Sequence, residues 1–534
     1  MTVDDTASAP FCDLPTLVAE HARARPQATA LVVGERRLSY GELDALADRV
    51  AAGLQRDGLQ VGERVAVCGS SSPEYLAVFL GTLRAGGAVA PLAPGSTAEQ
   101  LVGMAVDADA RRFFIDGDVA AALAAASATT SAATSATARA TAGVALPADL
   151  PLTRLDAHDG QAPLAPWLPA VGAKPTPVTI DPAGPFNLIY SSGTTGTPKG
   201  IVQSHGMRWG HIQRAAISGY AADGITLIAT PLYSNTTLVS VIPTLAYGGC
   251  VVLMPKFDAL AYLQIAERER ASHTMLVPVQ YQRLMARPEF DGFDLSAFRM
   301  KFCTSAPFGA ALKADVLKRW PGGLVEYYGM TEGGGTCILQ AHLHPTKLHT
   351  VGQPAEGHDI RLIDEQGSEV ARGEAGEVVG RSGAMMTGYH KQPAKTAEAE
   401  WFDAAGQRYI RTGDVGRFDE DGFLTLFDRR KDMVISGGFN IYPSDLETVL
   451  RQHPAVADAA VVGVPSAEWG ETPVAYVVRR EAHTDSAESI RDWLNHQVGK
   501  TQRLSGLRLI DELPRSAIGK VLKRELREAW ATLD

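Results

Sequence analysis

Hydrophobic and polar residues alternate along the first hundred positions in a way that predicts a layered α/β fold. Residues 38–56 begin with Ser39 and Glu42, the two polar residues of a capping box, and leucine and valine then recur at helical spacing. The next expected elements are a short buried strand, a helix that ends at glycines and another strand, at residues 62–69, 73–87 and 88–94. Strand, helix and strand at this spacing favour a parallel sheet covered by helices.

The pattern changes twice in the second half of the chain. Strands and helices alternate again through residues 225–303, whereas from residue 376 onward shorter apolar runs are separated by glycine-rich turns. After a charged stretch near residue 430, the remaining chain follows a compact α+β pattern. We therefore predict an α/β protein with a large N-terminal domain of stacked α/β layers, a β-rich subdomain and a small α+β C-terminal domain.

Two stretches are unusual in composition but suggest no chemistry. Residues 124–143 are a low-complexity run of alanine, serine and threonine without an apolar face, which indicates a surface insertion or loop. Residues 238–255 are strongly apolar, but Pro243 and a glycine pair interrupt them. Because a membrane span needs about 20 predominantly apolar residues, this shorter, interrupted stretch predicts buried helix or strand instead.

Composition narrows the possible partners. The chain has 534 residues, of which 45% are hydrophobic and 21% charged, and its formal net charge is −10. An acidic chain without a dense Lys/Arg block is a poor match for nucleic acid. The five cysteines form no CxxC pair, which argues against a zinc site and a disulfide framework. The first residues lack the basic and apolar segments of a signal peptide, so we expect a cytoplasmic protein.

One loop points to phosphate chemistry. Residues 190–200 read YSSGTTGTPKG, in which glycines and small hydroxyl residues lead to a single lysine, Lys199. The run follows an apolar strand, and such loops can cradle phosphate with their backbone amides. It does not match the P-loop pattern GxxxxGK[ST], because Pro198 precedes the lysine and Gly200 follows it. The stretch therefore indicates a phosphate-binding loop of another kind.

The full string resembles the AMP-binding signature of the adenylate-forming superfamily, which includes acyl-CoA synthetases, nonribosomal peptide adenylation domains and beetle luciferases. Further motifs of that family follow in its order: LSYGEL (38–43), LRAGGAVAPLAP (83–94), YYGMTEGG (327–334), GYHKQPAKTAE (388–398), YIRTGDVGRF (409–418), DRRKDMVISGGFNIYPSDLE (428–447) and PRSAIGKVLKREL (514–526). The resemblance covers nearly the whole chain. It implies an adenylate-forming domain at residues 1–428, a hinge at 429–431 that includes Lys431, and a mobile C-terminal domain at 432–534.

The resemblance implies a reaction in two steps. A carboxylic acid attacks the α-phosphate of ATP to give acyl-AMP and pyrophosphate, and a thiol, usually coenzyme A, then displaces AMP. Glu332 is the implied ligand of the required Mg²⁺. Thr331 would contact the α-phosphate, and Lys520 would bridge that phosphate and the acid carboxylate. The loop around the β- and γ-phosphates would consist of Ser191, Ser192, Gly193, Thr194, Thr195, Gly196, Thr197 and Lys199.

The same resemblance places the nucleoside and coenzyme A. Tyr328 would stack on adenine through its aromatic face. Asp414 would accept both ribose hydroxyls, because a carboxylate has two acceptor oxygens, and Arg429 would also reach the ribose. The segments that flank the nucleotide would be Ser305, Ala306, Pro307 and Gly329. The tunnel for the pantetheine arm would pass Gly437 and Gly438, which leave room for a narrow thiol arm beside the backbone.

The residues implied for the acid depart from the family pattern. Many aryl and fatty acyl ligases have a histidine after the aromatic residue that is Tyr233 here, but this chain has Ser234. No acidic residue lies between Asp223 and Asp258, which argues against an α-amino acid substrate. Tyr327 stands where 4-coumarate–CoA ligases have glycine, and its bulk would shorten the acid pocket. A polar cluster in this segment either hydrogen-bonds a substituted acid or caps a helix. It consists of Ser234, Asn235, Thr236 and Thr237.

The sequence thus predicts an ATP-dependent, AMP-forming acid–CoA ligase that favours short- or medium-chain or aryl acids. Its co-substrates and cofactors would be ATP, coenzyme A and Mg²⁺, with no nucleic acid partner and no membrane span. Two alternatives remain. The acceptor could be a carrier protein or another nucleophile, including nitrite activation for diazotisation. The chain could also be a non-catalytic nucleotide-binding sensor, although a sensor would not need Lys520.

Overall fold

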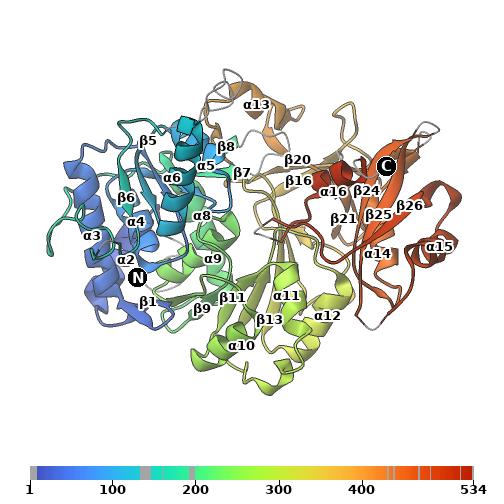
Figure 1. The fold of residues 1–534 in the computed structure, drawn as a ribbon, viewed down its shortest axis with the longest axis horizontal. Helices are drawn as coiled ribbons and strands as arrows, with labels where there is room; N and C mark the ends of the chain where they lie inside the picture. The colour runs from blue at the N-terminus through green and yellow to red at the C-terminus, as the bar shows by residue number, and fades with distance from the viewer. Residues whose placement is uncertain are drawn as a thin grey trace.

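The residues that the structure describes form four β-sheets, of which the two largest are surrounded by helices (Figure 1). The computed structural model describes residues 9–132, 146–158, 160–191, 199–429, 432–436, 439–466, 469–481, 483–516 and 519–531. Within these residues no helix is both long enough and apolar enough to cross a membrane.

The first large sheet has seven strands in the order β18-β8-β7-β4-β3-β5-β6. Its members are β3 (Arg64–Cys68), β4 (Ala88–Leu92), β5 (Ala110–Ile115), β6 (Leu152–Arg154), β7 (Pro185–Ser191), β8 (Lys199–Ser204) and β18 (Gly388–Tyr389). β3 and β4 are parallel and are joined through α4 (Pro73–Arg84), which confirms the predicted strand–helix–strand unit. The predicted capping box is also present at the start of α3 (Tyr40–Arg56).

The second large sheet has nine strands in the order β15-β14-β13-β12-β11-β9-β10-β1-β2. Its members are β1 (Thr29–Val33), β2 (Arg36–Ser39), β9 (Ile225–Ile228), β10 (Cys250–Leu253), β11 (His273–Leu276), β12 (Met300–Cys303), β13 (Gly323–Tyr328), β14 (Cys337–Gln340) and β15 (Gln353–Pro354). The strands from β9 to β13 run parallel, so their carboxyl ends meet at one edge of the sheet. In open α/β sheets, ligands bind at this edge.

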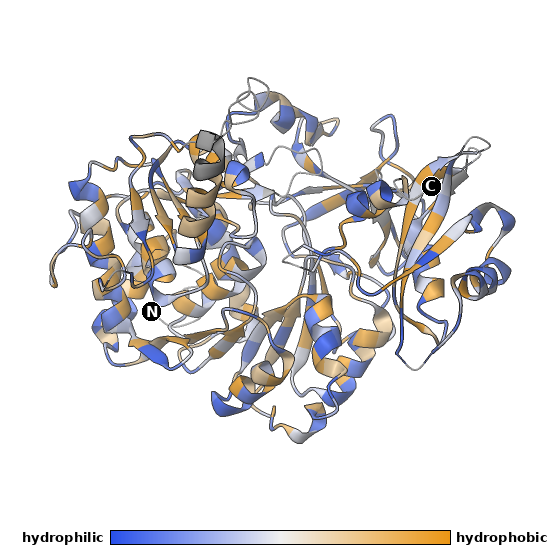
Figure 2. Cartoon of the chain, in the orientation of Figure 1, coloured by the Kyte–Doolittle hydropathy of each residue, from blue (hydrophilic) through white to orange (hydrophobic). Residues whose placement is uncertain are grey.

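The largest hydrophobic core joins the two sheets through several helices. Helices of the large domain are α2 (Leu14–Ala24), α3, α4, α5 (Ala98–Asp107), α6 (Gly117–Ala132), α8 (His205–Ala215), α9 (Asn235–Ala246), α10 (Ala259–Arg268), α11 (Pro278–Met285), α12 (Ala310–Arg319) and α13 (Pro393–Glu398). A Cβ atom on Gly81 of α4 would lie only 2.6 Å from the Cβ of Val50, so glycine permits the close packing of α3 and α4. Figure 2 shows apolar residues concentrated in the large sheets.

The predicted β-rich subdomain is a five-stranded sheet beside the large domain. Its strands are β16 (Asp359–Ile363), β17 (Gly376–Arg381), β19 (Glu400–Phe402), β20 (Arg408–Phe418) and β21 (Leu424–Arg429). The α+β region that follows contains a second five-stranded sheet with its own core. Its elements are β22 (Val434–Ser436), β23 (Phe439–Ile441), α14 (Pro443–Leu450), β24 (Val456–Ser466), β25 (Gly470–Arg479), α15 (Ala487–Gln497), β26 (Gly506–Ile510) and α16 (Lys523–Ala531).

Two sequence predictions meet different outcomes. The loop expected over residues 124–143 is wrong for residues 124–132, because α6 continues to Ala132. Alanine has the highest helix propensity, and Val119 and Leu123 anchor the start of this helix in a core. The apolar stretch 238–255 forms parts of α9 and β10, both largely buried, as predicted.

Candidate functional site

Three segments implied for the acid and the nucleotide lie at the carboxyl edge of the nine-stranded sheet. The segment at residues 230–236 follows β9, Ser305 follows β12, and Tyr327 and Tyr328 end β13. The hydroxyls of Thr236 and Ser305 are 2.5 Å apart, so the first two segments are in contact. Ser305 has a φ of 82°, a left-handed conformation that non-glycine residues rarely adopt. Such outliers concentrate at binding and catalytic sites.

Ser234 caps a helix. It is the N-cap of α9, and its hydroxyl accepts a hydrogen bond from the backbone N–H of Thr236 at 3.3 Å. The capping interpretation is therefore confirmed for this hydroxyl, whose own O–H is still a hydrogen-bond donor. The neighbouring Asn235 has a buried side-chain oxygen without a hydrogen-bond partner among the described residues, so this polar group remains able to accept one.

Two hydrogen bonds to backbone carbonyl oxygens hold the loop after β13 in place. The side-chain amide of Gln203 donates to the carbonyl oxygen of Thr331 at 2.6 Å, and the N–H of Met386 donates to the carbonyl oxygen of Glu332 at 2.7 Å. Thr331 and Glu332 therefore lie in an anchored loop rather than at a helix start. Both residues are partly exposed.

The Glu332 carboxylate accepts a hydrogen bond from a tyrosine whose ring lies near a lysine. Tyr389 Oη donates to Glu332 Oε1 at 2.9 Å, and Lys199 Nζ lies 5.0 Å from the centre of the Tyr389 ring. Burial and the nearby Glu332 charge raise the pKa of Tyr389, so its hydroxyl remains a donor. No ion pair between described residues involves Glu332, so no protein cation neutralises its carboxylate in that part of the chain.

This carboxylate fits a Mg²⁺ ligand. Mg²⁺ prefers oxygen ligands and is usually bound by one or two carboxylates together with substrate phosphates and water. The described residues contain no group of three or more His, Cys, Asp or Glu side chains able to hold a metal alone. A single carboxylate that requires a phosphate partner matches that pattern.

Tyr328 and Asp414 are brought together by a hydrogen bond of 2.8 Å from the phenol to Asp414 Oδ2. Burial, followed by the Asp414 charge, raises the pKa of Tyr328 well above its usual value. Asp414 stands opposite Arg429 in the pairing of β20 with β21. The residues implied for adenine and ribose therefore lie side by side, although 86 positions separate Tyr328 from Asp414.

The C-terminal segment that contains Lys520 docks at the same sheet edge. The N–H of Ser516 donates to the carbonyl oxygen of Lys520 at 2.8 Å. Gly519 has a φ of +76°, and a Cβ atom there would lie 2.7 Å from Val279 Cγ1. Val279 belongs to α11, which follows β11 directly. The segment implied for adenylation thus contacts the large domain where the nucleotide residues lie.

Several predicted residues fall outside the described part of the chain. Ser191 pairs with Lys199 at the base of the phosphate loop, but its side chain is not described. The same holds for the side chain of Arg429. The positions outside the described residues are Ser192, Gly193, Thr194, Thr195, Gly196, Thr197, Lys431, Gly437 and Gly438. The other residues implied for the nucleotide lie in two loops: Ala306 and Pro307 follow β12, and Gly329 follows β13.

Sequence reasoning missed a cationic cluster beside Tyr327. Arg214 near the end of α8 contacts Nε2 of His358, and His211 lies one turn earlier on the same helix. Arg208, nearly fully buried, donates to Asn187 and Gln203. These are isolated residues in the sequence, and no motif or period marks them. Gln203 and Met386 were missed for the same reason, whereas Tyr389 belongs to the recognised GYHKQPAKTAE motif.

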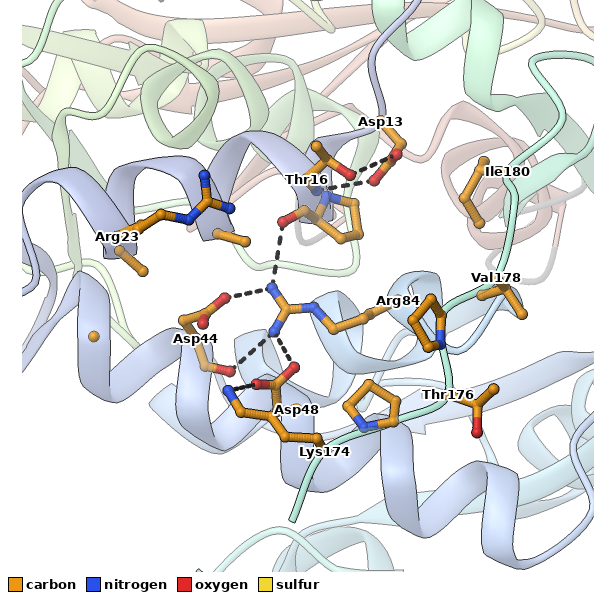
Figure 3. A pocket seen from close by; sticks show the side chains of 16 residues that line it. Asp13, Thr16, Arg23, Asp44, Asp48, Arg84, Lys174, Thr176, Val178 and Ile180 are labelled. Atoms are coloured by element: carbon orange, nitrogen blue, oxygen red, sulfur yellow. Dashed lines mark hydrogen bonds and ion pairs between the residues drawn. The ribbon is translucent and has the colours of Figure 1, made fainter. Parts of the chain in front are cut away.

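A surface cavity of about 530 Å³ lies elsewhere, among α2, α3, α4 and the segment near Lys174 (Figure 3). Arg84 bridges Asp44 and Asp48 at 2.6 and 2.7 Å, and Lys174 also contacts Asp48. None of the predicted site residues lines this cavity. Its central charges neutralise one another, which indicates a structural role in joining these elements.

Comparisons with known proteins agree with the geometry. A family described as AMP-binding enzyme matches residues 18–390, and one described as AMP-binding enzyme C-terminal domain matches residues 445–520. Feruloyl-CoA synthase of an Amycolatopsis species is 34% identical over 517 residues, covering 95% of this chain and 97% of the relative. Indoleacetate–CoA ligase of Aromatoleum aromaticum is 32% identical, with 97% and 98% coverage. ATP-bound MatB from Rhodopseudomonas palustris superposes with a TM-score of 0.84 at 30% identity, over 98% of this chain and 100% of that one.

Proposed function

Because the chain belongs to the family of AMP-binding enzymes, we propose that it is an ATP-dependent, AMP-forming acid–CoA ligase. It activates a small carboxylic acid as its adenylate, releases pyrophosphate and passes the acyl group to coenzyme A. The observation that carries this proposal is that two contacts, Tyr328 with Asp414 and Glu332 with Tyr389 beside Lys199, join strands of three sheets around the loop after β13. Two relatives that match nearly the whole chain are named as a feruloyl-CoA synthase and an indoleacetate–CoA ligase, which supports this proposal.

The first half-reaction needs charge placed around the phosphates. Bound Mg²⁺ would neutralise phosphate charge, and Glu332 would hold it. Lys199 and the loop before it would contact the β- and γ-phosphates, while Thr331 contacts the α-phosphate. Lys520 would hold the acid carboxylate against that phosphate. The carboxylate oxygen forms a bond to phosphorus as the bond to pyrophosphate breaks, and these fixed charges stabilise the transition state.

The nucleoside is held by the pair that the structure brings together. Tyr328 would stack on adenine while its hydroxyl keeps Asp414 in position, and Asp414 would accept the ribose hydroxyls with its remaining acceptor sites. Arg429, opposite Asp414 in the sheet, would assist at the ribose. Ser305, Ala306, Pro307 and Gly329 would line the adenine.

The second half-reaction transfers the acyl group to sulfur. The coenzyme A thiol attacks the acyl carbonyl of acyl-AMP, AMP leaves, and the thiol proton goes to solvent. We assign the hinge at residues 429–431, with Lys431, and the passage for the pantetheine arm at Gly437 and Gly438 as parts of this proposal. The boundaries 1–428 and 432–534 for the two domains belong to it as well. A cytoplasmic location, where ATP and coenzyme A are available, completes it.

An acid panel tests the proposed function. Purified protein is incubated with ATP, Mg²⁺ and one acid at a time, and pyrophosphate release and thioester mass are measured with coenzyme A, with a carrier protein or with neither. Acid-dependent pyrophosphate release and a coenzyme A thioester are expected. A thioester that forms only on the carrier protein would show that the acceptor is a carrier protein and not coenzyme A. Tight ATP binding without pyrophosphate release for any acid would favour a sensor and refute the proposal.

A further inference from the structure

The contact between Arg214 and His358 leaves one hydrogen-bonding conflict. Nδ1 of His358 accepts from the backbone N–H of Thr336 at 2.9 Å, and Nε2 of the same ring faces an N–H of Arg214. Burial, followed by the Arg214 charge, lowers the pKa of His358 to about 4, so the ring is neutral near pH 7. A neutral imidazole accepts at only one nitrogen. Both partners are donors, so two donors face each other at one end of the ring.

Arg214 also has no acidic partner in the described part of the chain, where its side-chain contact is His358. The charged or titratable groups that act on the neighbouring His211 are Arg214, Arg208 and His358, and each of them lowers its pKa after burial does. Buried charges in proteins are normally paired with an opposite charge. The guanidinium of Arg84 illustrates the usual case, since it lies between Asp44 and Asp48.

Arg208 and Arg214 serve different ends of the site. Arg208 donates to Gln203, whose amide holds the carbonyl of Thr331, so Arg208 supports the phosphate side. Arg214 lies farther along α8, and its partner His358 accepts from the backbone of Thr336, in the loop that follows Tyr327 and Tyr328. The Arg214 charge also acts on Tyr327, where it opposes the burial that raises the pKa of that phenol. Tyr327 is the residue that the sequence assigned to the acid pocket. The two facing donors, Arg214 and His358, therefore lie on the side of the site where the acid is expected.

We propose that Arg214 and His358 bind a second carboxylate of the substrate, so that the favoured acids are short dicarboxylic acids. This inference rests on the proposed function of the site. One carboxylate would react at the α-phosphate, and the other would accept from Arg214 and from the Nε2–H of His358. A carboxylate that accepts from both donors removes their conflict and neutralises the guanidinium. Arg presents its donors in a fork that suits a carboxylate. The bulk of Tyr327 favours a short chain between the two carboxylates.

Matched acid pairs test this inference. Butanedioate, pentanedioate and hexanedioate are compared with butanoate, pentanoate and hexanoate for kcat/KM of pyrophosphate release. The wild type is expected to prefer the diacid of a pair by roughly tenfold or more, because a charged hydrogen-bond partner is otherwise lost. Arg214→Gln should lose this preference mainly through KM for the diacid, with KM for ATP unchanged. Arg372→Gln, an exposed arginine in the β-rich subdomain, is the matched control and should behave as wild type.

The outcomes separate the two proposals. Reaction with monoacids and not with diacids would overturn the second carboxylate site and leave the ligase function intact. Equal loss on both acid classes in Arg214→Gln, or a raised KM for ATP, would also overturn it. No pyrophosphate release with any acid would refute both. Arg214→Lys and His358→Gln provide further variants if Arg214→Gln does not fold, and each should weaken the diacid preference while a thermal melt shows an intact fold.

Discussion

Lys313 and Glu326 form a buried ion pair whose loss we expect to destabilise the large domain. Lys313 lies on α12 and Glu326 on β13, with relative exposures of 1% and 4%, and their charged groups are in direct contact. Lys313 Nζ also donates to the carbonyl oxygens of Leu348 at 2.8 Å and Thr350 at 3.0 Å. Lys313→Met leaves a buried carboxylate without its partner, which costs about 3–5 kcal/mol of unfolding free energy.

The cost of Lys313→Met should depend on pH. Burial raises the pKa of Glu326, and the Lys313 charge opposes this shift, so removing Lys313 raises that pKa further. The folded state then keeps a proton on Glu326 at pH values where the unfolded state has lost it. Stability therefore falls as pH rises from the ordinary glutamate range to the new folded pKa. We expect a smaller loss at pH 5.5 than at pH 8.

Urea unfolding followed by circular dichroism at both pH values measures these effects. Lys318→Met, on an exposed position of the same helix, is the control and should change stability by less than about 0.5 kcal/mol. Adding Glu326→Gln to Lys313→Met should recover part of the loss, because no charge then remains buried. A cost below about 1 kcal/mol, or one that does not change with pH, would show that the pair does not act as argued.

Three further variants address the site itself. Lys520→Ala should slow acid-dependent pyrophosphate release by about 100-fold or more, while supplied acyl-adenylate is still converted to thioester; equal damage to both half-reactions would contradict its assignment. Glu332→Gln should raise the Mg²⁺ concentration for half-maximal activity by about tenfold or more, and an unchanged Mg²⁺ titration would count against metal binding. Tyr327→Gly should cost about 3–5 kcal/mol of stability yet raise relative kcat/KM for longer or bulkier acids, and unchanged selectivity across the acid panel would place Tyr327 outside the pocket.

Local signals explain what the sequence predicted well. The capping box of Ser39 and Glu42 is a contact between neighbours along one helix, so its residues are visible together in the sequence. The alternation of apolar strands and helices likewise predicts parallel layers, whose carboxyl edge then collects the loops of the site. Loop motifs identified Tyr328 and Asp414, and the fold shows that they touch.

Other features depend on contacts between distant parts of the chain. Arg214 and His358 are 144 positions apart, and each is a single residue without a pattern around it. Ser234 looked equally suited to capping a helix or to binding the acid, because both uses need only a hydroxyl at that place. The sequence predicts a loop for residues 124–132, because this stretch has no apolar face. The high intrinsic helix propensity of alanine nevertheless extends α6 through it.

The glycine at position 519 permits a close approach between the C-terminal segment and the large domain. It brings the backbone beside Lys520 against Val279, at a distance that no side chain on residue 519 would allow. The side chains that approach this position are those of Val277 and Val279, both apolar. If Lys520 acts as we propose, a protein engineer could use this one position to shorten the time that the lysine spends at the site, because any atom added to residue 519 would disfavour the docked arrangement.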